Sequence, residues 1–264
     1  MKFGNCVNLV DAAKNRPEFI HTMKKWRFDF IEASFAALTT ATEEEFEAAV
    51  ALAKEADLPV PVCNGMFPGA TIRIAGDDRD PEAVKEYVEK GFTRAKKLGV
   101  KYVVLGSDKA RQLPDGYDQD QAYEEFIELI KEAIVPACEK HEITILIEPL
   151  RKPVNFINTL EDGMRVVNGV NSPWVKLIAD TIHMITSGED PTYVHQIKDS
   201  ILHVHVSDWN RALPEFKFSS ELANVLREIK KSGYDGTYSF EAMAGPSPLT
   251  LHRALLTLKQ RVGA

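Results

Sequence analysis

The sequence predicts an α/β protein built as a single (β/α)8 barrel, and three observations lead to this prediction. Short apolar runs alternate with longer stretches of helical periodicity along the whole chain of 264 residues. The short runs are continuously apolar, as in Tyr102–Leu105 and Ile145–Ile147, which is typical of parallel strands covered on both faces. Eight strands and eight helices in alternation favour one closed barrel over an open doubly wound sheet, because barrels reach ~250 residues as one domain.

The predicted strands are the short apolar runs, taken in chain order. They are Phe3–Leu9, Phe28–Ala33, Leu58–Val62, Lys101–Leu105, Thr144–Ile147, Val175–Ile178, Ile201–Val206 and Thr237–Phe240. The longest connections to a following helix come after the third and fourth strands, over 63–80 and 106–118. In a barrel such connections lie on the catalytic face.

The predicted helices follow the strands and carry recognisable end signals. Thr42 precedes three glutamates, and Asp80 precedes a proline, which are signals for helix starts. Gly99 and Gly233 follow lysine-rich ends and predict helix stops. The helices are Pro17–Lys25, Glu43–Ala56, Pro81–Leu98, Gln119–His141, Leu160–Val167, Pro191–Ile197, Ser220–Ser232 and Pro248–Gln260. No linker or repeat divides the chain, so we expect one domain over 1–264.

Composition restricts the class of protein. The chain has 39 acidic and 32 basic residues, a net charge of −7, which disfavours a nucleic-acid partner. Its three scattered cysteines (Cys6, Cys63 and Cys138) predict a reducing compartment without a disulfide framework. No apolar run reaches the ~18–20 residues of a membrane span, and no apolar segment of a signal peptide follows Met1. We therefore expect a cytoplasmic protein with no membrane partner.

Polar side chains stand at the ends of the last four predicted strands. They are Glu148, Asp180, His205 and Glu241. Any one carboxylate after a strand is often a helix cap, but the carboxyl ends of barrel strands converge on one mouth. Three carboxylates and a neutral imidazole form an oxygen and nitrogen donor set for Mn²⁺, Mg²⁺, Co²⁺ or Zn²⁺. The sequence therefore predicts a metal site made of these four residues.

Other polar or aromatic residues lie close to this site in the sequence. His183 follows Asp180 by three residues, and three roles stay open for it: ligand of a second metal, donor to substrate, or neighbour of a ligand. Arg211 lies in the connection after the seventh strand and can hold a substrate hydroxyl or phosphate. Trp209, between His205 and Arg211, can stack on the apolar face of a sugar. His203 shares the strand face of His205 but lies further from the strand end, so we expect it to pack inside the barrel.

These motifs resemble the xylose-isomerase-like barrel superfamily, and within it the D-tagatose 3-epimerase/D-psicose epimerase group. The motifs that carry the resemblance are Ile147–Leu150, Asp180–Met184, His205–Arg211, Glu241 and the connection 106–117. The resemblance implies one divalent metal, Mn²⁺ first, and a sugar or sugar-phosphate substrate. It also implies that Glu148 and Glu241 are the acid/base pair and that His183, Arg211 and, less directly, Glu32 contact substrate. Related enzymes are often homodimers or homotetramers.

The implied reaction is proton transfer next to a ketose carbonyl, through an enediolate, giving 3-epimerisation. Returning the proton to the neighbouring carbon would instead give aldose–ketose or hydroxypyruvate isomerisation, and loss of a hydroxyl would give an inosose-type dehydratase. A non-catalytic metal-binding barrel is a further alternative. An endonuclease IV-like reading is disfavoured because no histidine lies between His21 and His141.

The chain departs from the epimerase pattern in two places. The segment Arg151–Asn155 follows the Glu-Pro-Leu motif, where the epimerases have a substrate-contacting glutamate. Leu213-Pro214-Glu215 stands where many relatives have Pro-Gly. Both departures leave the predicted metal ligands in place and affect the expected substrate.

Overall fold

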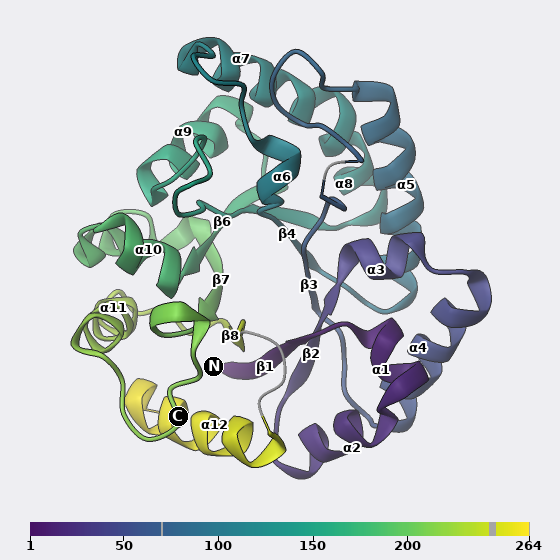
Figure 1. The fold of residues 1–264 in the computed structure, drawn as a ribbon, viewed down its shortest axis with the longest axis vertical. Coiled ribbons are helices and arrows are strands. Elements are labelled where there is room, and N and C mark those ends of the chain that lie inside the picture. The colour runs from purple at the N-terminus through teal and green to yellow at the C-terminus, as the bar shows by residue number, and fades with distance from the viewer. Residues whose placement is uncertain (70, 243–246, 264) are drawn as a thin grey trace.

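The computed structural model describes residues 1–69, 71–242 and 247–263, and its centre is a closed barrel of eight parallel strands. Each strand pairs with its neighbours in chain order, and β8 closes on β1 (Figure 1). The strands are β1 Lys2–Val7, β2 Phe30–Ser34, β3 Val62–Asn64, β4 Tyr102–Leu105, β5 Thr144–Ile147, β6 Val175–Asp180, β7 Ile201–Val206 and β8 Thr237–Phe240. The predicted (β/α)8 TIM barrel is confirmed.

The third strand differs from the prediction. The sequence predicts Leu58–Val62, but the strand runs over Val62–Asn64. Pro59 and Pro61 lack an amide hydrogen and therefore cannot donate to a sheet. Their carbonyl groups instead accept hydrogen bonds, Pro59 from Ile31 and Pro61 from Lys101 and Tyr102. The apolar run correctly predicted that a strand lies here, but because of the two prolines the residues that pair with neighbouring strands begin only at the end of the run.

Helices surround the barrel on its outer face (Figure 1). The α-helices are α1 Leu9–Asn15, α2 Pro17–Lys25, α3 Phe35–Thr40, α4 Glu43–Glu55, α5 Pro81–Lys97, α6 Asp108–Arg111, α7 Gln119–Leu129, α8 Val135–His141, α9 Leu160–Val170, α10 Thr181–Ser187, α11 Ser220–Lys231 and α12 Pro248–Val262. The π-helix η1 Ile130–Ile134 joins α7 to α8, and η2 Pro191–His195, η3 Lys198–Ser200 and η4 Trp209–Arg211 are 3-10 turns. Within the described residues, no helix is long and apolar enough to cross a membrane.

The prediction missed the short helices that begin directly after a strand. α1, α3, α6 and α10 were not predicted, and the predicted helix at 191–197 is the shorter 3-10 turn η2. In α3 and α10 the capping residue is itself the last residue of the strand, Ser34 and Asp180. Because strand and helix share one apolar run there, periodicity does not reveal the boundary.

The barrel interior is layered, and this layering places the site. An apolar cluster inside the barrel contains Phe30, Val62, Val104, Leu146 and Ile178. Side chains on one strand face recur every second residue. Three members of this layer are followed two residues later by acidic side chains: Phe30 by Glu32, Leu146 by Glu148 and Ile178 by Asp180. These acidic side chains therefore lie one layer closer to the mouth. The apolar layer forms the floor on which the polar layer lies.

One acidic side chain outside the site gives a pH-dependent stability. The Leu160 amide at the start of α9 donates to Oε2 of Glu189 at 2.7 Å, while Oε1 of Glu189 is buried and has no hydrogen-bond partner among the described residues. Burial raises the pKa of Glu189 to about 7. Since the folded pKa exceeds the unfolded one, the stability contribution of Glu189 is complete below about pH 4.5 and is lost as the pH rises through 7.

We expect Glu189→Gln to stabilise the protein at pH 8 by about 1–2 kcal/mol and to have little effect at pH 4.5. The amide oxygen of glutamine can still accept from Leu160, but the cost of burying a charge disappears. Urea unfolding of both variants at the two pH values measures the difference. An equal difference at pH 4.5 and pH 8 would contradict this expectation.

Candidate metal and active site

Four side chains from the ends of four consecutive strands meet at the mouth of the barrel. Glu148 directly follows β5, Asp180 ends β6, His205 is the fifth residue of β7, and Glu241 directly follows β8. The backbone beyond the strands stays anchored, because the Glu148 amide donates to Leu105 O at 3.1 Å and the Glu241 amide to Val206 O at 3.3 Å. Both glutamates are therefore held as extensions of the sheet.

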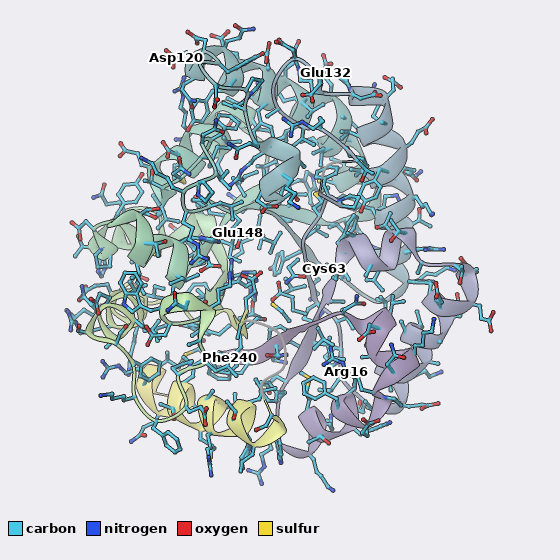
Figure 2. All side chains as sticks on the ribbon, in the orientation of Figure 1. Arg16, Cys63, Asp120, Glu132, Glu148 and Phe240 are labelled. Atoms are coloured by element: carbon cyan, nitrogen blue, oxygen red, sulfur yellow. The ribbon has the colours of Figure 1, made fainter. Side chains whose placement is uncertain are left out.

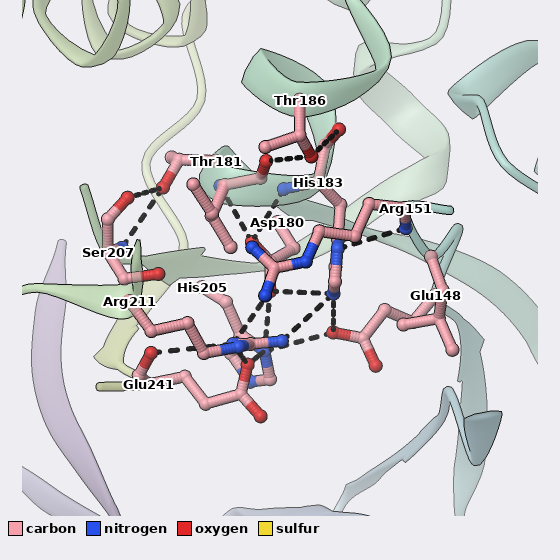
Figure 3. Close-up of polar contacts among 12 residues, drawn as sticks. Glu148, Arg151, Asp180, Thr181, His183, Thr186, His205, Ser207, Arg211 and Glu241 are labelled. Carbon is pink, nitrogen blue, oxygen red and sulfur yellow. Dashed lines mark hydrogen bonds and ion pairs between the residues drawn. The ribbon is translucent and has the colours of Figure 1, made fainter. Parts of the chain in front are cut away.

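The ligand atoms of these four residues all lie within 4.8 Å of one another. Nδ1 of His205 is 3.3 Å from Oε1 of Glu148, 3.3 Å from Oε2 of Glu241 and 3.7 Å from Oδ2 of Asp180 (Figure 3). Among all side chains of the protein, Glu148 lies near the barrel axis, while Asp120 and Glu132 point outwards from the periphery (Figure 2). The four predicted ligands are thus brought together.

Asp180 serves two purposes with its two oxygens. Oδ1 accepts hydrogen bonds from the amides of Ile182 at 2.9 Å and His183 at 3.3 Å, and so caps α10. Oδ2 faces the other three ligand residues. One carboxylate can therefore cap a helix and still offer an oxygen to a metal ion.

The donor set fits a divalent cation. Oε1 of Glu148, Oδ2 of Asp180 and Nδ1 of His205 are buried and have no hydrogen-bond partner within the described part of the chain. Buried polar atoms without partners are rare and costly. Here three such atoms face a common point, together with the Glu241 carboxylate, and a hard or borderline cation would satisfy all of them.

The electrostatics of the site follow from burial and close charges. Burial raises the pKa of Glu148, and the neighbouring Glu241 acts in the same direction. Burial would also raise the pKa of Asp180, but His183, His205 and Arg211 lower it well below its ordinary value. Glu148 and Asp180 therefore differ in proton affinity, although both lie in the same cluster.

The predicted substrate contacts His183 and Arg211 lie at the cluster. Nε2 of His183 is 3.6 Å from Oδ2 of Asp180, and its Nδ1 accepts a hydrogen bond from the Arg151 amide at 3.1 Å. The Arg211 guanidinium pairs with Glu241 and lies 3.5 Å from Oδ2 of Asp180 (Figure 3). Trp209, at the start of η4, is 43% exposed and contacts none of the four ligands through a hydrogen bond or ion pair among the described residues.

Glu32 does not have the position expected of a pocket residue. It has no exposed surface, and its two carboxylate oxygens face His203 and His205 at 2.8 and 2.7 Å. It lies behind His205 rather than beside the open side of the cluster. His203 is fully buried inside the barrel, where the sequence placed it.

Two residues that matter to the site were not among the predicted ligands, acid/base residues and substrate contacts. Gly106, directly after β4, leaves the space that Glu148 fills, because a Cβ at Gly106 would overlap Oε2 of Glu148. Arg111 in α6 is fully buried, and burial lowers its pKa to about 10 while the charge of Glu148 acts in the opposite direction. The signal for Gly106 was its position at a strand end, where the other strands carry polar residues.

The closed barrel with a cluster at its mouth defines the class of fold, and comparison with known proteins places the chain in a family. The model of the xylose isomerase-like TIM barrel family matches residues 20–260. The chain therefore belongs to the xylose isomerase-like TIM barrel family.

Individual relatives are epimerases by name. A D-psicose 3-epimerase from Enterocloster bolteae is 27% identical over 222 residues, which cover 78% of this chain and 70% of the relative. A D-psicose 3-epimerase from Clostridium cellulolyticum H10, solved with D-tagatose, has a TM-score of 0.83 at 18% identity and covers 99% of both chains. A 3-keto-D-glucoside 4-epimerase from E. coli has a TM-score of 0.79 at 20% identity, over 98% of this chain and 99% of that one. The structural matches show a shared fold.

Proposed function

We propose that the protein is a divalent-metal-dependent ketose 3-epimerase. The observation that carries the proposal is the placement of Glu148 and Glu241, which follow β5 and β8 at one mouth, each 3.3 Å from Nδ1 of His205. Two carboxylates at one site suit removal of a proton and its return. The epimerase names of the relatives support the same reaction class.

In the proposed mechanism, Glu148, Asp180, His205 and Glu241 hold the cation. When bound, a divalent cation would polarise the ketose carbonyl as a Lewis acid and stabilise the negative charge that develops on its oxygen. Mn²⁺ is the first expectation because the resemblance to the epimerases implies it, and the donor set of three carboxylates and one imidazole also suits Mg²⁺, Co²⁺ and Zn²⁺.

The proton steps belong to the two glutamates. One carboxylate takes the proton from the carbon next to the carbonyl, and the electron pair of the broken C–H bond moves towards the carbonyl oxygen. The other carboxyl group gives a proton to the opposite face of the same carbon, which inverts its configuration. His183 and Arg211 lie close enough to the cluster to hold hydroxyl groups of a sugar in place.

The deciding experiment is product analysis in D₂O with a panel of ketoses, ketose phosphates and inososes, each with Mn²⁺, Mg²⁺ or Co²⁺. A ketose 3-epimerase gives a product of unchanged composition that carries deuterium at C3. Loss of water would indicate a dehydratase, and an aldose product would indicate an isomerase. Either outcome would overturn the 3-epimerase proposal, as would the absence of turnover on every substrate.

Removal of the metal gives a second check. We expect treatment with a chelator to abolish turnover and to lower the thermal midpoint by about 5–10 °C, because a cation at 100 times its Kd stabilises the folded state by about 2.7 kcal/mol. Adding Mn²⁺ back should restore both. Asp180→Asn, which loses one charge of the donor set, should show a smaller shift, and an unchanged midpoint in the wild-type protein would argue against a resident cation.

A further inference from the structure

A chain of hydrogen-bonded side chains lies behind His205, on the side away from the other three ligand residues. Nε2 of His205 is 2.7 Å from Oε1 of Glu32, and Oε2 of Glu32 is 2.8 Å from Nε2 of His203. Nδ1 of His203 is 2.7 Å from Oγ1 of Thr237. The chain joins β2, β7 and β8 across the inside of the barrel.

The donors and acceptors of this chain fit in one arrangement. An ionised carboxylate can only accept, so both histidines donate from Nε2 to Glu32. Nδ1 of His203 is then left for the hydroxyl group of Thr237. Nδ1 of His205 is left for the mouth of the barrel, where it faces Glu148, Asp180 and Glu241.

Burial makes this arrangement strong. Glu32, His203 and His205 have no exposed surface, so water cannot replace any of the bonds. Another close neighbour of Nε2 of His205 is Sγ of Cys6, at 4.0 Å.

We propose that Glu32 is a positioning residue, which holds His205 in the tautomer and orientation that present Nδ1 to the cation, and that His203 and Thr237 hold Glu32 in turn. The proposal rests on the proposed function in so far as a cation binds at Nδ1. Metal-bound histidines commonly donate their second N–H to a carboxylate, and loss of that carboxylate typically weakens metal affinity 10–100-fold. Glu32 acts through His205 and not on substrate.

The test is Glu32→Gln, because glutamine keeps the size of the side chain but has one acceptor oxygen and one donor group. It cannot accept from both histidines, so one imidazole must turn or move its hydrogen. In the metal-free protein we expect NMR of the imidazoles to show a hydrogen-bonded hydrogen on Nε2 of both His203 and His205 in the wild type, and loss of that signal for one of them in Glu32→Gln. Titration with Mn²⁺ or Co²⁺, followed by calorimetry, should show 10–100-fold weaker binding in the variant.

A matched control separates positioning from a general loss of buried polar contacts. Thr39→Val removes a buried hydroxyl that donates to Phe35 O at 2.8 Å, far from the chain of side chains, and should leave tautomer and affinity unchanged. If Glu32→Gln does not fold, Glu32→Asp keeps the charge but lacks the reach to both histidines, and it should weaken binding 3–10-fold. A folded Glu32 variant with wild-type tautomer and wild-type affinity would overturn the proposal.

The two proposals can fail separately. A wild-type protein that binds no cation contradicts the proposed function, while the tautomer of metal-free His205 still tests the role of Glu32. A wild-type protein that binds the cation, together with Glu32 variants of equal affinity, contradicts the positioning role and leaves the proposed function standing.

Discussion

Glu241→Gln is expected to lower kcat at least 1,000-fold while leaving the fold intact. In the proposed mechanism this glutamate supplies one of the two carboxylates that move the proton, and loss of a positioned acid or base typically costs about 10²–10⁴-fold. Its side chain is 25% exposed and lies at the end of β8, so the amide replacement disturbs little packing. Turnover of the best ketose, the circular dichroism spectrum and the bound metal per chain are the three measurements.

The metal measurement separates the two roles of Glu241. Glutamine keeps an oxygen that can bind a cation, so we expect the variant to retain metal at high Mn²⁺ concentration and still not turn over. Glu221→Gln, a surface glutamate in the first turn of α11, is the matched control and should keep full activity. Full activity of Glu241→Gln would exclude Glu241 as acid or base.

Gly106→Ala is expected to lower kcat about 100-fold through Glu148. A Cβ at residue 106 would overlap Oε2 of Glu148, whereas it would meet Leu150 at an ordinary contact distance. The carboxylate must then move out of its place between Gly106 and His205. A misplacement of about 1 Å at a reacting group can cost about 100-fold in rate, while overpacking by one methyl group costs about 1–3 kcal/mol of stability.

Gly169→Ala is the control for the packing part of this effect. Residue 169 lies in α9, where a Cβ would overlap the end of the flexible Ile127 side chain. Both variants should lose comparable stability in urea, but Gly169→Ala should keep its kcat. If Gly106→Ala turns over at the wild-type rate, the position of Glu148 does not depend on Gly106.

The fold could be predicted because its strands are short apolar runs separated by well-capped helices. The third strand lies nearer the end of its apolar run than predicted, because Pro59 and Pro61 in that run have no amide hydrogen to donate to a sheet. The pattern of apolar residues does not reveal this local effect. The helices α3 and α10 were missed for a related reason, since Ser34 and Asp180 end a strand and cap a helix at once.

The four-residue cluster could be predicted because the carboxyl ends of barrel strands meet by topology alone. The position of Glu32 could not be predicted. The sequence does not say whether a strand side chain points into the barrel or outwards, and its depth depends on how the barrel closes. A glutamate within the apolar strand Phe30–Ser34 signals a special role, but its pairing with His203 and His205 joins residues 171 and 173 positions apart. Sequence spacing carries no such information.

Asp180 caps α10 with one oxygen and faces the cluster with the other, so one side of the mouth is held by a helix. The side formed by the connection after β7 is not held in this way. His183 lies in the first turn of the helix that Asp180 caps, so its distance from the cluster is set by one turn of backbone. Arg211 instead sits in a segment where both it and Asn210 have positive φ, on a connection that packs at the rim. For the proposed epimerase, replacements in that connection are expected to alter which sugar binds while Asp180 and His183 keep their places on α10, so new specificities could arise without rebuilding the chemistry.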